Sequence, residues 1–509
     1  MTDTTPATPP DRAARDWTCP FCSLLCDGLT LAPAHDGASW SLGGSDCPRA
    51  LAALQHASPA AIACSALVDG RPVSLDEAIA AAAERLSRWT LPLYGGLATD
   101  VAGARALYRL MNRTGGVADH ANGDALATGL RAMQDRGAFY TTLAEIKAHA
   151  DLIVCLGSRP DDHYPEFFRR CGVGEPGAFV ESREVIGVAW PADTTASPAA
   201  DATDATGGPP ADDTVAPATA DAPAAGGTQQ IAARGVSFNA ILPGADVHAT
   251  AATLAALCAG RRLSRPADPA LEALAGRMKA ARYVALVWEP GSVARHGSLV
   301  AEAVLQCVAA LNAKGRAAAF ALGGSEGGYT VQQAFTWMSG LPLRTALRAG
   351  RFDHDPLRHA GKRLLADRAV DGLFWVSSFG PAPALPKPGG DAPAVIDTRM
   401  TEPPDDLAEP LPAIVLGHPA QGAALEGRAG VVFIPVGTPG IDGAGHLFRT
   451  EGSVLIPLVP ARDGGLPGVA EIVARIAAAL PARAGAAQAA SADGATATTS
   501  NINPTGATA

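Results

Sequence analysis

The sequence lacks the features that place a protein in a membrane, outside the cell or on a nucleic acid. No run of about eighteen uninterrupted apolar residues is present to span a membrane. The first eighteen residues carry no apolar core behind a basic start, as a secretory signal would. The net charge of −10 argues against broad nucleic-acid binding, which needs a basic stripe. We therefore expect a soluble, cytoplasmic protein that binds neither membrane nor nucleic acid.

The sequence is also poor in the patterns of hydrolytic and nucleotide-binding sites. Its eleven histidines are scattered, and neither His-x-His nor His-Glu-x-x-His occurs, so we expect no dinuclear zinc site in this chain. The glycine-rich stretch 323–328 lacks both the lysine of a P-loop and the spacing of a dinucleotide fingerprint. We interpret it as a tight turn, with nucleotide binding as the alternative.

Four cysteines near the start of the chain are the strongest chemical signal. Cys19, Cys22, Cys26 and Cys47 follow C-x2-C-x3-C-x20-C spacing. Thiolates are the ligands of soft metals and iron–sulfur clusters. Structural zinc sites more often present two C-x2-C pairs or mix cysteine with histidine. The spacing therefore favours a [4Fe–4S] cluster, and zinc or no bound metal are the alternatives.

The remaining cysteines are spread along the chain and do not form the pattern of a disulfide framework. We expect them to be small buried hydrophobic residues. They are Cys64, Cys155, Cys171, Cys258 and Cys307.

Short apolar segments that stop at a turn recur along the chain, and amphipathic helices separate several of them. The helix expected between Ser74 and Trp89 has a capping serine, with Glu77 three residues later. Buried strands that alternate with helices predict parallel sheets in an α/β protein, and 509 residues predict about three domains. The strand candidates are residues 152–156, 283–288, 373–376, 413–416 and 431–434.

Three segments have compositions that predict little structure. Residues 1–16 are expected to be a flexible leader. Residues 191–230 are nearly all Ala, Asp, Thr, Pro and Gly, and residues 483–509 are similar. Such segments cannot bury enough apolar surface to offset the entropy of ordering, so we expect a disordered insertion and a disordered tail.

Several blocks of sequence, taken in order, carry a family resemblance. They are Cys19–Asp27, Gly115–Asp119, Glu145–Ile153, Phe335–Pro342 and Pro439–Ile456. Together they resemble the B subunit of formylmethanofuran dehydrogenase, in the wider molybdopterin oxidoreductase superfamily. The resemblance implies an α/β, molybdopterin-oxidoreductase-like fold with a small N-terminal Cys-cluster domain and two Rossmann-like α/β domains. The implied units are a Cys-rich domain at 17–60, an α/β domain at 61–150 and 345–480, and an inserted α/β domain at 151–344.

The departures from the family pattern bear on the chemistry. Where the family has the cysteine or selenocysteine that binds molybdenum or tungsten, this chain has Ala125, followed by Leu126 in place of a histidine. Alanine has no lone pair for a metal. The family's Asp-Pro-Arg is here Glu181-Ser182-Arg183, and its Glu-Pro-His-Arg-Thr is residues 417–421, Gly-His-Pro-Ala-Gln. We therefore expect no catalytic residue at Ala125 and no molybdopterin.

The altered metal-ligand and pterin-contact positions are consistent with a relative of the dehydrogenase that carries out no redox reaction. Within the resemblance, they imply the B subunit of a bacterial formyltransferase/hydrolase complex, which converts formyl-tetrahydromethanopterin to formate by way of a methanofuran-like carrier in one-carbon metabolism. The implied partners are a zinc amidohydrolase-like A subunit, a C subunit and a formyltransferase D subunit. This chain would be a scaffold. The alternatives are an active molybdenum or tungsten dehydrogenase subunit and a metal-free binding module.

Overall fold

The computed structural model describes residues 13–36, 38–57, 64–190, 228–233, 236–293, 295–348, 350–381, 385–386, 411–462 and 466–481. Most of the predicted leader and insertion, and the whole predicted tail, lie outside these ranges. Two predicted boundaries were wrong by a few residues, because residues 14–16 and 228–230 belong to strands. No helix among the described residues has the length and apolarity needed to cross a membrane.

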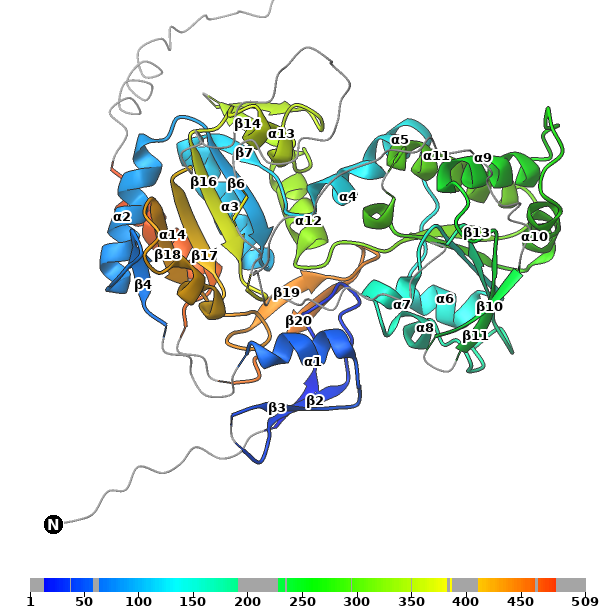
Figure 1. Cartoon of the computed structure of the whole chain (residues 1–509), viewed down its shortest axis with the longest axis horizontal. Helices are drawn as coiled ribbons and strands as arrows, with labels where there is room; N and C mark the ends of the chain where they lie inside the picture. Colours follow the sequence, from blue (N-terminus) through cyan, green and yellow to red (C-terminus); the bar gives the residue numbers. More distant parts are fainter. Residues whose placement is uncertain are drawn as a thin grey trace, which may run out of the picture.

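The described residues form a mixed α/β fold with several sheets, as the sequence predicted (Figure 1). The largest sheet has nine strands in the order β15-β14-β7-β6-β16-β17-β18-β4-β5, and its five middle strands are parallel. The strands are β4 (Ala66–Val68), β5 (Arg71–Val73), β6 (Pro92–Ala98), β7 (Gly116–Ala118), β14 (Thr345–Arg348), β15 (Arg351–His354), β16 (Gly372–Ser377), β17 (Ala413–Gly417) and β18 (Val431–Pro435).

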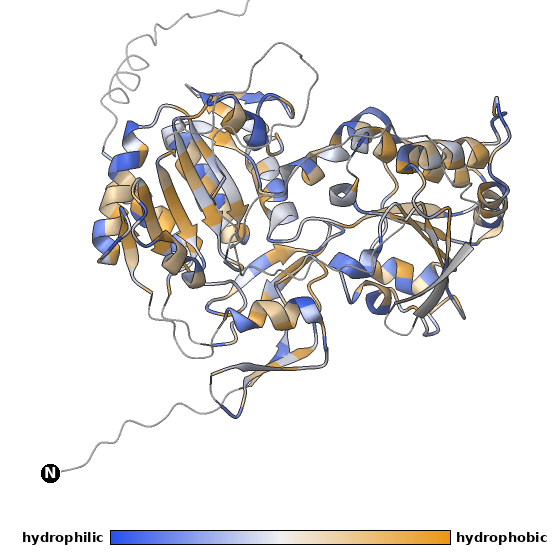
Figure 2. Ribbon diagram, viewed as in Figure 1, coloured by the Kyte–Doolittle hydropathy of each residue, from blue (hydrophilic) through white to orange (hydrophobic). Residues whose placement is uncertain are grey.

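Helices cover both faces of this sheet. One face packs against α2 (Leu75–Arg88), α3 (Val101–Thr114), α12 (Gly328–Ser339) and α14 (Val469–Ala479), and the other against α13 (Gly361–Ala366) and the 3-10 helix η3 (Pro419–Leu425). The predicted helix after Ser74 is confirmed, with its capping box to Glu77 formed. The middle strands β16, β17 and β18 are hydrophobic along most of their length (Figure 2), as strands covered on both sides must be.

A second sheet has six strands in the order β10-β11-β9-β8-β12-β13, parallel except for β10. Helices α9 (Val247–Cys258), α10 (Pro269–Ala280) and α11 (Gly297–Leu311) cover one face. The other face packs against α6 (Leu143–His149) and α8 (Phe167–Arg170). The strands are β8 (Leu152–Leu156), β9 (Glu184–Val188), β10 (Thr228–Ala233), β11 (Val236–Ile241), β12 (Val284–Trp288) and β13 (Ala317–Ala321).

The N-terminal segment forms a small three-stranded sheet and a helix: β1 (Ala14–Trp17), β2 (Leu29–Pro33), β3 (Trp40–Gly43) and α1 (Pro48–Gln55). Its core is continuous with one face of the six-stranded sheet, since Trp17 and Leu24 share a buried cluster with Phe167 and Phe320. The N-terminal segment therefore has no separate core of its own.

Short elements connect the two large sheets (Figure 1). After β7 the chain runs through α4 (Gly123–Thr128) and α5 (Leu130–Arg136) to reach the six-stranded sheet. Helix α7 (Pro160–His163) follows β8, and the 3-10 helix η1 (Pro290–Ser292) follows β12. The hairpin of β19 (Gly445–Phe448) and β20 (Leu455–Leu458) completes the fold between the sheets and the N-terminal segment.

Candidate functional site

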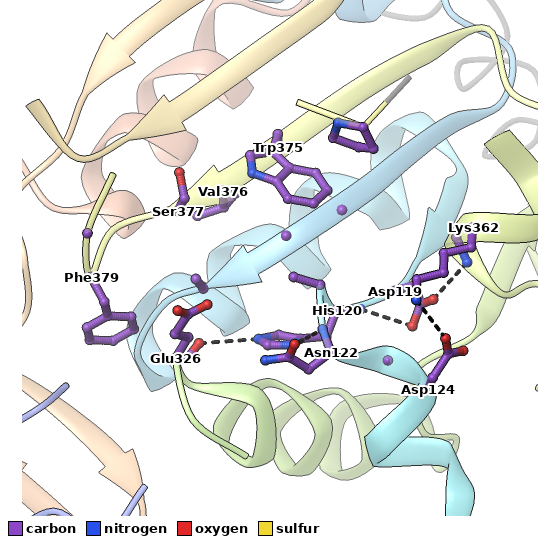
Figure 3. A pocket seen from close by; sticks show the side chains of 18 of the residues that line it. Asp119, His120, Asn122, Asp124, Glu326, Lys362, Trp375, Val376, Ser377 and Phe379 are labelled. Atoms are coloured by element: carbon purple, nitrogen blue, oxygen red, sulfur yellow. Dashed lines mark hydrogen bonds and ion pairs between the residues drawn. The ribbon is translucent and has the colours of Figure 1, made fainter. Parts of the chain in front are cut away.

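A cavity of about 610 Å³ lies where the carboxyl ends of β6, β7 and β16 meet (Figure 3). This edge of a parallel sheet is where ligands of α/β proteins usually bind. The sheet contributes Gly95, Gly96 and Trp375, and the N-terminal segment contributes Arg49 of α1 and His56, which follows that helix. The volume is that of a pocket for a small molecule.

Asp119 and His120, which follow β7, form the floor of this cavity and are both buried. The Asp119 carboxylate accepts hydrogen bonds from the backbone N–H groups of His120 (3.0 Å) and Gly361 (2.7 Å). The Nδ1 atom of His120 accepts from the N–H of Asn122 (3.0 Å), so Nε2 carries the proton and lies 3.3 Å from the carbonyl oxygen of Glu326. Burial lowers the pKa of His120, which keeps the ring neutral.

A buried guanidinium closes the polar network on the other side of the floor. Arg344 lies 3.4 Å from Asp119 through Nε, pairs with Asp124 through a terminal nitrogen, and donates to the carbonyl oxygen of Pro356 (2.8 Å). Lys362 lies 3.1 Å from the second Asp124 oxygen. Burial alone would raise the pKa of Asp124, but the Arg344 and Lys362 cations hold it below its ordinary value. The floor is therefore a closed set of hydrogen bonds and ion pairs.

Ala125 is not one of the residues that line this cavity, although its neighbours Gly123 and Asp124 are. Its methyl group instead faces the turn at Gly291, where an added Cβ would lie 3.7 Å away. The residues present do not fit the metal-pterin of the dehydrogenases, because the expected ligand position has no donor atom.

Arg183, in the segment that matches the family's Asp-Pro-Arg, is buried and forms hydrogen bonds with backbone groups. Its guanidinium donates to the carbonyl oxygens of Gly172, Glu175 and Lys147. These bonds hold the loop that follows α8 against the end of α6. A guanidinium engaged by three carbonyl groups is a structural anchor, and it is not a residue of the cavity wall.

His418, in the second altered segment, caps η3. Its Nδ1 accepts the N–H of Ala420 (3.2 Å), while Ser377 at the end of β16 donates to Gln421 Oε1 (3.0 Å). Burial is the largest effect on His418 and lowers its pKa to about 4, with Arg462 acting in the same direction and Asp442 against it. The neutral imidazole is thus a capping group.

The four cysteines of the N-terminal segment line one small shared cavity, and each is 6–7 % exposed. The turn that brings them together is fixed by the Cys19 N–H, which donates to the Cys26 carbonyl (2.9 Å), and Cys47 stands directly before α1. Burial raises the pKa of the Cys19, Cys22 and Cys26 thiols, that of Cys26 to about 12, and neighbouring thiols add to the effect at Cys19 and Cys26.

Thiols are the residue type that soft metals select, and a cation would replace the thiol protons that burial otherwise retains. The space between the thiols is about 10 Å³, enough for a single ion or water. Across the described residues, no group of three or more His, Cys, Asp or Glu side chains already has the geometry of a metal site.

Arg49 connects the two cavities, since it lines both of them together with Phe21. Its Nε donates to the Phe21 carbonyl (2.9 Å) and a terminal nitrogen donates to the His163 carbonyl (3.0 Å). His163 in turn lies 3.0 Å from the buried carboxylate of Glu289, whose hydrogen bond raises the pKa of the imidazole. A chain of contacts therefore runs from the cysteines to the turn after β12.

Sequence reasoning missed most of these partners. Arg344, Lys362 and Trp375 reach the cavity from segments more than two hundred residues after Asp119, so no local pattern marks them. Residues 323–327 also match the pattern Gly-x-Ser-x-Gly of the nucleophile elbow in hydrolases, which the sequence analysis did not recognise. Ser325 lies between β13 and α12 and contacts the Tyr164 hydroxyl and the N–H of Ser23. Its hydroxyl has no bond to an imidazole in the described structure, so it lacks the base of an activated nucleophile.

No family model matches the sequence. The sequence is 26% identical over 391 residues to the B subunit of the formyltransferase/hydrolase complex Fhc from Methylorubrum extorquens, covering 77% of this chain and 90% of that protein. It is 29% identical over 176 residues to the B subunit of tungsten-containing formylmethanofuran dehydrogenase 2 from Methanocaldococcus jannaschii, covering 33% of this chain and 40% of that protein.

The fold is similar to a solved structure. It matches a chain of the crystal structure of the formyltransferase/hydrolase complex FhcABCD from Methylorubrum extorquens in complex with methylofuran. The TM-score is 0.61 at 25% identity, and the match covers 82% of this chain and 98% of that chain. The resemblance predicted from the sequence blocks is confirmed by these matches.

Proposed function

We propose that this chain is a non-redox scaffold subunit of a formyltransferase/hydrolase complex. The complex would convert formyl-tetrahydromethanopterin to formate by way of a methanofuran-like carrier, and the steps at the formyl group would occur on other subunits. The observation that carries the proposal is the position of Ala125, which has no donor atom and faces Gly291 outside the main cavity. The similarity to the Fhc B subunit over most of both chains supports the same function.

The closed network on the cavity floor supports a structural role. A general base needs a proton-accepting atom that can reach the substrate. Asp119 accepts two backbone N–H groups and pairs with Arg344, and His120 uses Nδ1 for Asn122. Both groups are therefore occupied in holding β7, α4, α13 and β14 together.

The alternative, an active molybdenum or tungsten dehydrogenase subunit, is less favoured. The similarity to the tungsten-containing enzyme covers one third of this chain, whereas the similarity to the Fhc B subunit covers more than three quarters. The dehydrogenase would also need another donor at position 125, and no step through a pterin-bound metal follows from the residues that are present.

The proposal includes partners and an architecture. We expect an amidohydrolase-like A subunit, a C subunit and a formyltransferase D subunit, together in the cytoplasm. The N-terminal segment would be a Cys-cluster domain of the molybdopterin-oxidoreductase type, followed by two Rossmann-like units. The parallel five-strand cores of the two large sheets support this architecture.

We also propose that Cys19, Cys22, Cys26 and Cys47 hold a metal centre, either a [4Fe–4S] cluster or zinc. Four buried thiols around one space support it. The centre would contribute to folding by joining the turn at Cys19–Cys26 to the start of α1, because ligation and folding are coupled in such sites.

Metal analysis of the complex, purified without oxygen, tests both proposals. We expect zinc in the complex, without molybdenum or tungsten, and iron or zinc that is lost from this chain in a Cys26→Ser variant. Molybdenum or tungsten near one per complex would overturn the scaffold function. A Cys26→Ser complex with unchanged iron and zinc would overturn the metal centre and leave the scaffold function intact.

A further inference from the structure

A groove of about 350 Å³ lies among the helices that cover one face of the six-stranded sheet. Helices α5, α9 and α11 lie side by side there (Figure 1), and α11 contacts both of the others. The groove is lined mainly by small apolar side chains, so another chain can approach the helix backbones closely. These residues are Ala255, Ala259, Ala309 and Ala310, with the buried side chain of Leu305.

An exposed aromatic ring stands at this groove on a fixed backbone. Phe139 lines the groove and is 53 % exposed. The Ala319 N–H of β13 donates to the Phe139 carbonyl oxygen (2.7 Å), and the Thr141 N–H donates to the Ala319 carbonyl oxygen (3.1 Å). Aromatic side chains are enriched at protein interfaces, and a group that is held in place before binding loses less entropy when a partner covers it. Phe139 therefore has the setting of an interface anchor.

The charge at the groove is positive. Its ionisable lining residues are Arg136 and Arg261. Arg136 donates to the Glu302 carboxylate (2.7 Å), but Arg261 is exposed and has no ion-pair partner in the part of the chain that the structure describes. The same holds for Arg262 and Arg265, which follow in the loop after α9. A partner segment that carries carboxylates would neutralise this charge, whereas a basic segment would be repelled.

We propose that this groove binds an acidic amphipathic helix of a partner subunit. Apolar side chains of that helix, at the i, i+3, i+4 and i+7 spacing of helix-in-groove recognition, lie against the alanines and Phe139. Its Asp or Glu side chains lie beside Arg261. The inference rests on the proposed scaffold function, which requires contact with other subunits, and it adds one docking surface and the chemistry of the segment that occupies it.

Site-specific cross-linking in the whole complex tests the occupant. Photoreactive p-benzoylphenylalanine is placed at position 139, the complex is purified with its partner subunits and irradiated, and mass spectrometry identifies the linked peptides. We expect a link to a segment of another subunit that has apolar residues at helical spacing and acidic residues beside them. The same group at position 179, where Phe179 is 61 % exposed near the end of α6, is the matched control and should not link to that segment. A link to a second copy of this chain, a link to a basic segment or the absence of any link would overturn the proposal.

Two substitutions test the anchor and the charge separately. Phe139→Ala and Arg261→Glu should each raise the dissociation rate of the partner subunit roughly tenfold, measured as loss of that subunit from the complex after dilution. The effect of Arg261→Glu should shrink as the salt concentration rises, because salt screens exposed charges, whereas the effect of Phe139→Ala should persist. Both side chains are exposed, so both variants should keep the thermal midpoint of the wild type.

Arg295→Glu is the matched control for charge. Arg295 is exposed before the start of α11, does not line the groove, and its substitution changes the net charge by the same amount. A complex with Arg295→Glu that dissociates as fast as the one with Arg261→Glu would overturn the proposal. Unchanged dissociation in both groove variants would overturn the docking surface and leave the scaffold function intact, whereas a wild-type chain that forms no complex would overturn both.

Discussion

The pH dependence of stability should reveal the cap formed by His418. The folded pKa is about 4, whereas an unperturbed histidine has a pKa near 6.5. The pKa of His418 is therefore lower in the folded chain. Between pH 4 and pH 6.5 its imidazole binds a proton in the unfolded chain and not in the folded chain. The contribution of His418 to stability is complete above pH 6.5 and is lost as the pH falls towards 4. The same protonation would remove the Nδ1 acceptor of the Ala420 N–H.

The size of the effect follows from the two pKa values. At pH 5 proton linkage gives a loss of about 2 kcal/mol relative to pH 7.5, and the loss approaches about 3 kcal/mol near pH 4. For a folding unit of about two hundred residues, 2 kcal/mol corresponds to roughly 4–8 °C in the unfolding midpoint. His163 titrates with the opposite sign, because its folded pKa is raised. The pH dependence of the wild type alone would mix the two histidines, so the stability of the wild type must be compared with that of a variant of His418 at each pH.

The assay is thermal unfolding of the wild type and a His418→Asn variant at pH 7.5, 6.5, 5.5 and 5. Asparagine is a good N-cap and supplies an oxygen for the Ala420 N–H, but it does not titrate. We expect similar midpoints at pH 7.5 and a wild-type midpoint that falls below the variant's as the pH decreases. Parallel profiles across the whole range would refute the buried neutral cap.

Three further changes test the site and the fold. Arg344→Met should destabilise the protein by about 3–5 kcal/mol, because the buried Asp119 carboxyl loses its charged partner while burial, which raises its pKa, is no longer opposed; Arg344→Lys is the control, and denaturant unfolding would show whether the two variants differ. Ala125→Cys should not bring molybdenum or tungsten into the complex, and either metal at a stoichiometric level would show that position 125 does reach the cavity. Gly70→Ala should lower the thermal midpoint more than Gly28→Ala does. Both glycines have φ near +70°, but only a Cβ at position 70 would lie 2.3 Å from the backbone nitrogen of Gly427. Equal losses in thermal midpoint would contradict this contact.

Local sequence patterns predicted the fold well where one segment carries the whole signal. The run at 152–156 is apolar throughout and becomes β8, and Ser74 with Glu77 starts α2. Patterns failed at the ends of low-complexity segments, where residues 14–16 and 228–230 gain strand partners from elsewhere in the chain. Strand pairing supplies hydrogen bonds that composition does not reveal.

The candidate site was predictable only in part for the same reason. The four cysteines were marked by their spacing, and Asp119 only as the end of a block that resembles the family. The partners Arg344 and Glu289 could not be found in this way, because they meet the site through tertiary contacts. The direction of the Ala125 methyl group depends on how α4 leaves β7, which residue identity alone does not determine.

The buried cluster shared by Trp17 and Phe320 also sets an order of events during synthesis. The cysteine turn leaves the ribosome early, but the strand that carries Phe320 follows about 300 residues later. At translation rates of roughly 5–20 residues per second, the turn waits about 15–60 s for its packing partner. During that time the turn lacks the part of its buried cluster that β13 supplies. A metal could bind this segment before the core closes or while it closes. Binding before the core closes would cover the thiols of the nascent chain for longer than binding at closure.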